Sequence, residues 1–164
     1  MIVIIFGLPG SGKSYFAQRL AQILHAKYIN SDTVRKELFI TPSYSADEKK
    51  LVYNEIKKRM MKEAFQKEIV IDATFSNIET RQDFIQTAKK FSTVFIIEIY
   101  ADENLIKQRL LRARKNSDAN FEVYKKIKSQ WQAYNDAHMV LRSTDNNITD
   151  MLDKASDYLF QKNE

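Results

Sequence analysis

Short apolar runs alternate with amphipathic stretches along this chain of 164 residues. Residues 1–6 and 69–71 contain only apolar side chains, a pattern typical of strands that are buried on both faces of a parallel sheet. Three more segments are predicted to be extended, at residues 27–30, 93–99 and 139–141. The pattern therefore predicts five strands.

Between these strands, apolar residues recur every three or four positions, as on one face of a helix. Helices are predicted at residues 15–25, 33–39, 102–115, 121–134 and 150–160, and two more follow the capping boxes at 45–48 and 76–79 and run through residues 65 and 90. Three of these helices carry apolar stripes that we expect to face the core. The stripes are Leu51, Val52, Ile56, Met60 and Phe65; Leu105, Ile106, Leu110 and Ala113; and Tyr124, Ile127, Trp131 and Tyr134. The last is more typical of core than of a base-stacking platform.

Strands that alternate with helices indicate an α/β fold, with a five-stranded parallel sheet between two layers of helices. The length fits one domain, residues 1–164. Ligands in such folds bind beyond the carboxyl ends of the strands. We therefore expect the site in the loops at residues 7–14, 30–35, 72–77 and 142–147.

The chain carries 26 Lys and Arg residues against 21 Asp and Glu residues, a net charge of +5. This mild basicity suits an anionic ligand without identifying nucleic acid. There is no cysteine, which excludes disulfides and thiolate metal sites. The first strand begins at once, and no apolar stretch approaches the roughly 20 residues that span a bilayer. We therefore expect a cytoplasmic protein with no signal peptide and no membrane segment.

All three glycines fall in the run GLPGSGKS, which matches the phosphate-binding pattern GxxxxGK[ST]. A strand precedes the run and a helix follows it, so a glycine-rich turn that binds nothing is disfavoured. Lys13 would reach the β- and γ-phosphates of a nucleoside triphosphate, and the Ser14 hydroxyl would hold Mg²⁺. The residues expected to bind the nucleotide are Gly7, Leu8, Pro9, Gly10, Ser11, Gly12, Lys13, Ser14 and Tyr15.

Asp32 and Arg35 follow the second predicted strand. Phosphoryl transfer to an alcohol needs a carboxylate that orients the hydroxyl and takes its proton, and Asp32 lies in a suitable loop. Arg35, three residues later, would face the same side and bind an anion of the acceptor. Position alone leaves open the alternative that Asp32 caps a helix and Arg35 is solvated.

Asp72 ends the third predicted strand, and Thr74 adds a hydroxyl at the same rim. A carboxylate at this point can bind Mg²⁺ through water, as a Walker-B aspartate does. The alternative is an aspartate that only stabilises the turn.

A cluster of cations occupies the helix predicted at residues 102–115. Arg109 and Arg112 are three residues apart and share a helical face, whereas Arg114 diverges. Arginines above the γ-phosphate would offset the charge that develops during transfer. A solvated helix face is the alternative for such a charge run.

Four segments together, GLPGSGKS, SDTVRKEL, VIDAT and RLLRARKNSDANFEVYK, resemble in order and spacing the P-loop kinases of the polynucleotide 5′-hydroxyl kinase type and their predicted-kinase relatives. The resemblance spans roughly residues 1–134. Many unrelated NTPases share the first segment, but the other three are jointly more specific. The resemblance implies a three-layer P-loop kinase fold with a helical lid at about residues 105–120, and ATP, or another NTP, with Mg²⁺.

The resemblance also implies a role for each matching residue. Asp32 would be the general base, Arg35 would contact a phosphate of the acceptor strand near Thr74, and lid arginines would grip the donor phosphates. The implied catalytic residues are Lys13, Asp32, Arg109 and Arg112; the implied substrate-binding residues are Arg35, Asp72 and Thr74; the implied metal-binding residues are Ser14 and Asp72.

The leading hypothesis is thus an ATP-dependent kinase that phosphorylates the 5′-hydroxyl of RNA or DNA, with single-stranded or nicked 5′ ends as partners. Polynucleotide kinases commonly carry a further repair module, whereas we expect a single kinase domain here, and the same framework serves kinases of small molecules. A kinase of a nucleoside, sugar or antibiotic hydroxyl is therefore the alternative. A nucleotide-gated binding module without useful turnover is a third possibility.

Overall fold

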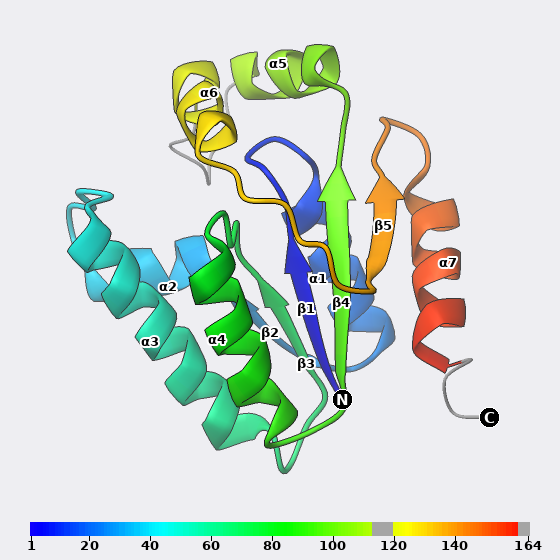
Figure 1. Ribbon diagram of the computed structural model, residues 1–164. Helices are drawn as coiled ribbons and strands as arrows, with labels where there is room; N and C mark the ends of the chain where they lie inside the picture. Colours follow the sequence, from blue (N-terminus) through cyan, green and yellow to red (C-terminus); the bar gives the residue numbers. More distant parts are fainter. Residues whose placement is uncertain (113–119, 161–164) are drawn as a thin grey trace.

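A computed structural model of the chain describes residues 1–112 and 120–160. Within these residues, five parallel strands form one sheet in the order β2-β3-β1-β4-β5 (Figure 1). The strands are β1 (Ile2–Phe6), β2 (Lys27–Asn30), β3 (Ile69–Asp72), β4 (Val94–Tyr100) and β5 (Met139–Arg142). The predicted five-stranded parallel sheet is confirmed.

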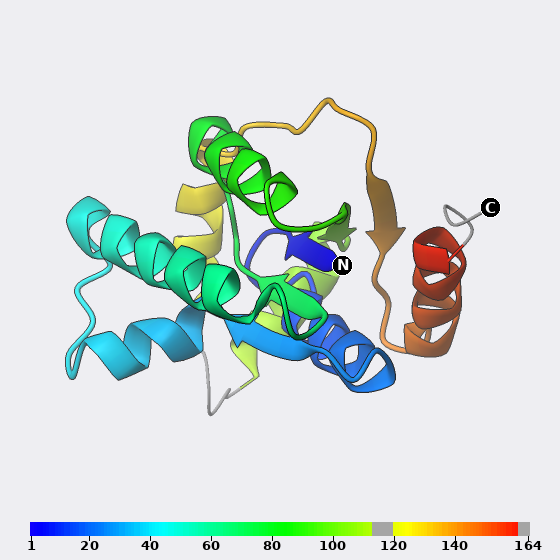
Figure 2. The same ribbon diagram turned by 90° about the horizontal axis from the view of Figure 1, so that it is seen from below.

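Helices cover both faces of the sheet, as the predicted three-layer α/β fold requires. The helices in the described residues are α1 (Lys13–Ile23), α2 (Ser31–Leu38), α3 (Ala46–Glu63), α4 (Ile78–Lys89), α5 (Glu103–Leu111), α6 (Phe121–Ser129) and α7 (Ile148–Phe160). Figure 2 shows α3 and α4 on one side of the sheet and α1 on the other. Helices α5 and α6 lie beyond the carboxyl ends of the strands (Figure 1).

Strand β1 explains why the first apolar run has no polar position. Successive side chains of a strand point to opposite faces, and both faces of this central strand are covered. Ile2, Ile4 and Phe6 pack in the core beneath α3 and α4, whereas Val3 and Ile5 pack in the core beneath α1 and α7. The strand that carries the glycine loop is therefore held rigidly from both sides.

Asparagines, rather than the predicted Ser and Asp residues, cap two of the helices. The Asn30 side chain accepts from the Thr33 N–H at 2.9 Å, and that of Asn77 accepts from the Thr80 N–H at 3.0 Å. Each satisfies an N–H that has no partner inside its helix. Helix α2 consequently begins at Ser31 rather than Thr33.

Two predicted helices end earlier than expected. Helix α5 ends at Leu111 because Arg112 has an extended backbone. The last three residues of the predicted helix, 113–115, lie outside the described residues. Helix α6 ends at Ser129, so Trp131 and Tyr134 lie in the connection to β5. Tyr134 is nevertheless buried. The expected core role of the aromatic stripe holds, although its helical spacing does not continue.

The long helix α3 buries only part of its predicted stripe. Val52, Ile56 and Met60 are fully buried, whereas Leu51 is 53% exposed and Phe65 is 78% exposed. Leu51 lies next to Val52 and so projects about 100° away from the buried face. Phe65 lies beyond the end of the helix at Glu63.

No helix within the described parts of the chain is long and apolar enough to cross a membrane.

Candidate active site

The loop between β1 and α1 needs its glycines for two reasons. Gly10 and Gly12 have φ of 80° and 92°, in the left-handed region that other residues rarely adopt. A Cβ added at Gly10 would lie 2.9 Å from Cγ2 of Ile106, and one at Gly12 would lie 2.8 Å from Oγ of Ser143. The loop therefore packs directly against α5 and the segment after β5, and it opens into α1 at Lys13.

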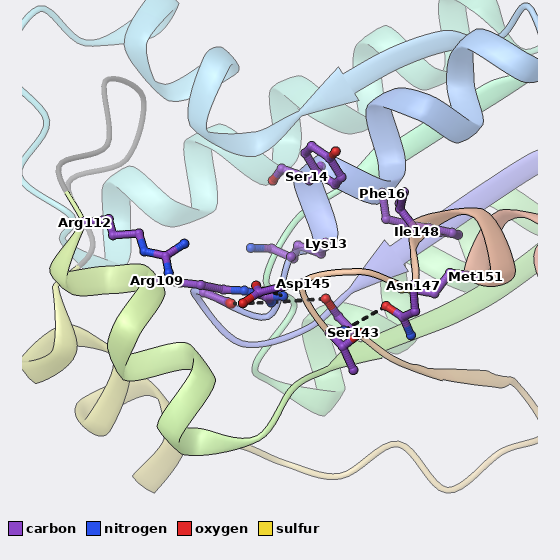
Figure 3. A pocket seen from close by; sticks show the side chains of 14 residues that line it. Lys13, Ser14, Phe16, Arg109, Arg112, Ser143, Asp145, Asn147, Ile148 and Met151 are labelled. Atoms are coloured by element: carbon purple, nitrogen blue, oxygen red, sulfur yellow. Dashed lines mark hydrogen bonds and ion pairs between the residues drawn. The ribbon is translucent and has the colours of Figure 1, made fainter.

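A cavity of about 460 Å³ opens beside this loop (Figure 3). It lies within the size range of small-molecule sites. Its walls come from the glycine loop and α1, from α5, and from the β5–α7 connection. The lining residues are Gly10, Gly12, Lys13, Ser14, Tyr15, Phe16, Arg109, Arg112, Ser143, Thr144, Asp145, Asn147, Ile148 and Met151.

The two ends of the cavity differ in chemistry. Lys13, Arg109 and Arg112 lie together at one end, and Ile148 and Met151 lie at the other (Figure 3). Cations beside the glycine loop suit phosphates, whereas an apolar end suits a base or another flat apolar group. A nucleotide has the same two ends, with charged phosphates at one and a flat base at the other.

Five of the nine predicted nucleotide-binding residues line the cavity, namely Gly10, Gly12, Lys13, Ser14 and Tyr15. Gly7, Leu8, Pro9 and Ser11 are not part of its lining. For the β5–α7 connection, the sequence analysis predicted a loop at residues 142–147 but no individual residue of the site. The loop could be predicted because it follows a strand at the carboxyl edge of the sheet, where ligands bind in such folds.

Arg109 joins three separate segments. Its Nη1 donates to the carbonyl oxygens of Gly10 and Ser11, at 3.3 and 3.2 Å, and to Oγ of Ser143 at 3.1 Å. Its Nη2 lies 3.4 Å from Oδ1 of Asp145. Arg109 thus binds the glycine loop to α5 and to the β5–α7 connection. The remainder of the predicted lid, residues 113–119 with Arg114, lies outside the described residues.

Asp72 is fully buried at the end of β3 and takes part in a network that the sequence did not reveal. Its Oδ2 accepts from the Tyr28 hydroxyl and from Nδ2 of Asn30, both at 2.7 Å. Burial raises the pKa of Tyr28 far above its ordinary value of 10, and the Asp72 carboxylate raises it further. Asn30 pairs directly with Asp72 across β2 and β3, so the network depends on a strand order that only the structure shows.

The second oxygen of Asp72 identifies where a metal would fit. Oδ1 is buried and has no hydrogen-bond partner among the described residues. The same residues contain no group of three or more His, Cys, Asp or Glu side chains that could enclose an ion. Mg²⁺ in nucleotide sites keeps several waters and relies on one or two protein ligands plus phosphates. The donor set of Ser14 and Asp72 fits that mode of binding.

Asp32 lies away from the cavity, in the first turn of α2 and half-buried. The pKa of Tyr53 is raised to about 12, mainly by burial; the Asp32 charge also raises it, whereas the hydrogen bond from the Phe75 N–H and the Arg35 charge oppose the rise. Asp32 and Arg35 therefore both lie near the Tyr53 phenol, which accepts from the Phe75 N–H at 3.1 Å. This places them on a second side of the site, across β3 from the glycine loop, together with the half-buried Thr74.

Arg35 is neither solvated nor free. It is 9% exposed, its Nη1 lies 2.6 Å from Oε1 of Glu48, and its guanidinium stacks on the Tyr44 ring at 4.7 Å. Burial alone would raise the pKa of Glu48, but hydrogen bonds from the Ser43 backbone, the Arg35 guanidinium and neighbouring groups hold it at about 2. Glu48 is thus charged at neutral pH and balances Arg35.

Comparison with known proteins identifies the family and the fold of the chain. The sequence profile that matches residues 2–137 describes an AAA domain. The chain belongs to this AAA domain family. A comparison with curated protein sequences finds no match.

Solved structures share the fold along almost the whole chain. An unliganded sugar kinase from Janibacter sp. superposes with a TM-score of 0.75 at 13% identity, over 96% of this chain and 93% of that one. The APS kinase of Mycobacterium tuberculosis, solved with AMPPNP and APS, gives 0.75 at 17% identity, over 96% of both chains. Kti12 of Chaetomium thermophilum, in complex with ADP-AlF3, gives 0.69 at 18% identity, over 96% and 98%. The predicted P-loop kinase fold is confirmed, and the narrower resemblance to polynucleotide kinases is not.

Proposed function

We propose that the protein is an ATP-dependent kinase that transfers the γ-phosphoryl group to an alcohol. The observation that carries this proposal is the division of the carboxyl edge of the sheet into two sides. The glycine loop, Lys13 and Arg109 border a cavity with a cationic and an apolar end, while Asp32 lies across β3 from them. A phosphoryl donor and a hydroxyl acceptor need such opposed sites.

Each residue then has a defined task. The backbone N–H groups of the glycine loop, with Lys13, Arg109 and Arg112, stabilise the charge on the phosphates. Asp32 orients the acceptor hydroxyl and takes its proton while the new O–P bond forms and the bond to the leaving ADP oxygen breaks. Bound Mg²⁺ would neutralise phosphate charge, and the Ser14 hydroxyl and the free oxygen of Asp72 would hold it.

A small molecule is the acceptor class that we place first. The fold is shared with proteins named as a sugar kinase and an APS kinase, and Arg35, predicted to clamp a polynucleotide phosphate, is balanced by Glu48. A 5′-hydroxyl of RNA or DNA is the second candidate. The order of the four motifs and the net charge of +5 favour it.

Transfer of ³²P from labelled ATP to a panel of acceptors tests both candidates. The panel contains sugars, nucleosides and aminoglycosides in one arm, and single-stranded and nicked 5′-hydroxyl oligonucleotides of RNA and DNA in the other. We expect label in the small-molecule arm. Label confined to the oligonucleotides would select the second candidate, and no label in either arm with intact ATP binding would exclude both.

Asp32→Asn separates a kinase from a nucleotide-gated binding module. The amide keeps the shape of the side chain but cannot accept the proton, so acceptor-dependent ATP consumption should be lost. Unchanged ATP consumption in this variant would favour the binding module.

A further inference from the structure

A second cation lies beside Arg35 on the acceptor side of the site. Lys49 is half-buried in α3, and its Nζ donates to Oγ of Ser76 at 3.1 Å. Ser76 is buried in the loop that follows β3. The first turns of α3 and α4 lie at the same end of the molecule as the carboxyl end of β3 (Figure 1). Lys49 therefore lies at the edge of the sheet where Asp32 lies.

Charge balance separates Lys49 from Arg35. Glu48 forms a nearly buried ion pair with Arg35, and it also accepts from the N–H and hydroxyl of Ser43, at 2.6 and 2.8 Å. Both of its oxygens are thus engaged. Within residues 1–112 and 120–160, no carboxylate forms an ion pair with Lys49.

An unbalanced ammonium in this position is costly. Burial lowers the pKa of Lys49 from its ordinary value, and the like charge of Arg35 lowers it further. A hydroxyl such as that of Ser76 accepts a hydrogen bond but brings no negative charge. Lysines are rarely buried without a partner. Lys49 thus has no anionic partner among the described residues and is available to bind an anionic ligand.

We propose that Lys49, together with the Ser76 hydroxyl, binds an anionic group of the acceptor, so that the acceptor is a hydroxyl compound that also carries a phosphate, sulfate or carboxylate. This inference rests on the kinase function proposed above. Lys49 would then bind the anion of the acceptor, a role that the sequence analysis assigned to Arg35. Arg35 instead forms an ion pair with Glu48, which leaves Lys49 as the cation without a carboxylate partner on this side of the site.

Direct anion binding tests the site without requiring turnover. The protein carries ¹³C-labelled lysine and is saturated with ADP and Mg²⁺, so that the glycine loop is filled, and inorganic sulfate is then titrated. We expect the Cε resonance of Lys49, assigned with Lys49→Arg, to shift to saturation, while that of the exposed neighbour Lys50 follows the bulk ionic strength. A Lys49 resonance that behaves like that of Lys50 would overturn the proposal.

Matched acceptors test the consequence for specificity. The pairs are a neutral sugar with its sugar acid, and a nucleoside with its 3′-monophosphate. The wild type should phosphorylate the anionic members. Lys49→Met, which keeps the apolar stem, should raise the acceptor KM roughly ten- to hundredfold, the usual effect of losing a charge-assisted hydrogen bond. The KM for ATP should stay unchanged, and the melting temperature should not fall, because the variant also removes an unbalanced buried charge.

Two controls distinguish charge from structure. Lys49→Arg should restore the acceptor KM to within a few-fold of the wild type, and Lys50→Ala should leave it unchanged. Equal use of neutral and anionic acceptors, or an unchanged acceptor KM in Lys49→Met, would overturn the proposal. If no acceptor is phosphorylated at all, the kinase function fails, and the sulfate titration still decides whether Lys49 binds anions.

Discussion

At the residue scale, the two oxygens of the Asp72 carboxylate differ, because one is held by protein groups and the other has no protein partner among the described residues. Oδ2 accepts from Tyr28 and Asn30, and Oδ1 is buried with no hydrogen-bond partner in the described residues. Partners that hold one oxygen of a carboxylate also orient the other. Under the proposed function, Tyr28 would therefore be a positioning residue for Asp72.

Tyr28→Phe should weaken metal binding without changing the fold. Asp72 would keep only the hydrogen bond from Asn30, so its free oxygen would be less well oriented. Loss of such an outer contact typically costs about 10-fold or more in metal affinity. Titration of the ADP complex with Mn²⁺, followed by electron paramagnetic resonance, measures this affinity directly. Tyr100→Phe, at an exposed position, is the matched control, and equal affinities in the two variants would contradict the role of Tyr28.

Lys13→Ala and Asp32→Ala should both inactivate the enzyme, by different routes. Lys13 lines the cavity and would contact the donor phosphates, so its loss should weaken ATP binding sharply and lower the rate by roughly 10²–10³-fold. Asp32 lies outside the cavity, so its loss should stop transfer and leave ATP affinity unchanged. Isothermal titration with ADP and single-turnover rates separate the two effects. Normal nucleotide affinity in Lys13→Ala would refute this division.

At the scale of elements, the glycine loop is held by α5 as well as by β1 and α1. Gly10 packs against Ile106 and Leu110, which face it from α5. Arg109, on the same helix, donates to the loop carbonyl oxygens and to Ser143. A shift of α5 therefore changes the loop and the β5–α7 connection together.

Arg109→Ala should affect nucleotide binding and turnover together. The variant removes a cation from the cavity and also the contacts that tie α5 to the loop, so we expect a higher KM for ATP and a kcat lower by roughly 10²–10³-fold. Steady-state kinetics with ATP varied measure both. Lys107→Ala, a cation on the same helix that is not part of the cavity lining, should behave like the wild type. Similar kinetics for Arg109→Ala and Lys107→Ala would show that Arg109 has neither function.

At the scale of the whole molecule, two apolar cores on the faces of the sheet hold the layers together. The ion pair of Arg35 with Glu48 adds a link between α2 and α3. This link is one of the few nearly buried charged contacts in the described residues, and its energy depends on pH. Protonation of Glu48 should therefore both weaken the contact between α2 and α3 and lower the stability of the fold.

Acid should remove the contribution of Glu48 to stability. Its pKa is about 2 in the folded protein, against an ordinary value of 4.5, so the unfolded chain binds the proton more readily. The contribution is fully present above about pH 4.5 and is lost as the pH falls toward 2. Urea midpoints measured from pH 7 to pH 2.5 should show this loss. Glu48→Gln should be less stable at pH 7 but lose less over that range, whereas Glu122→Gln at an exposed position should follow the wild type.

Patterns local in the chain predicted much of this protein. Apolar runs predicted the five strands, and periodicity predicted where helices occur. Helix ends were less accurate, because Arg112 leaves the helical conformation and Asn30 and Asn77 act as caps. The glycine loop could be predicted because its function depends on adjacent backbone groups.

What the sequence by itself determined is the set of elements and the phosphate-binding loop, because both depend on neighbouring residues. The tertiary structure alone decided which distant side chains meet. Tyr28 reaches Asp72 across 44 positions, Arg109 reaches Gly10 across 99, and Lys49 reaches Ser76 across 27. Such contacts follow from strand order and helix packing, in which a residue's partners are fixed by the surface on which it lies rather than by its neighbours in the chain.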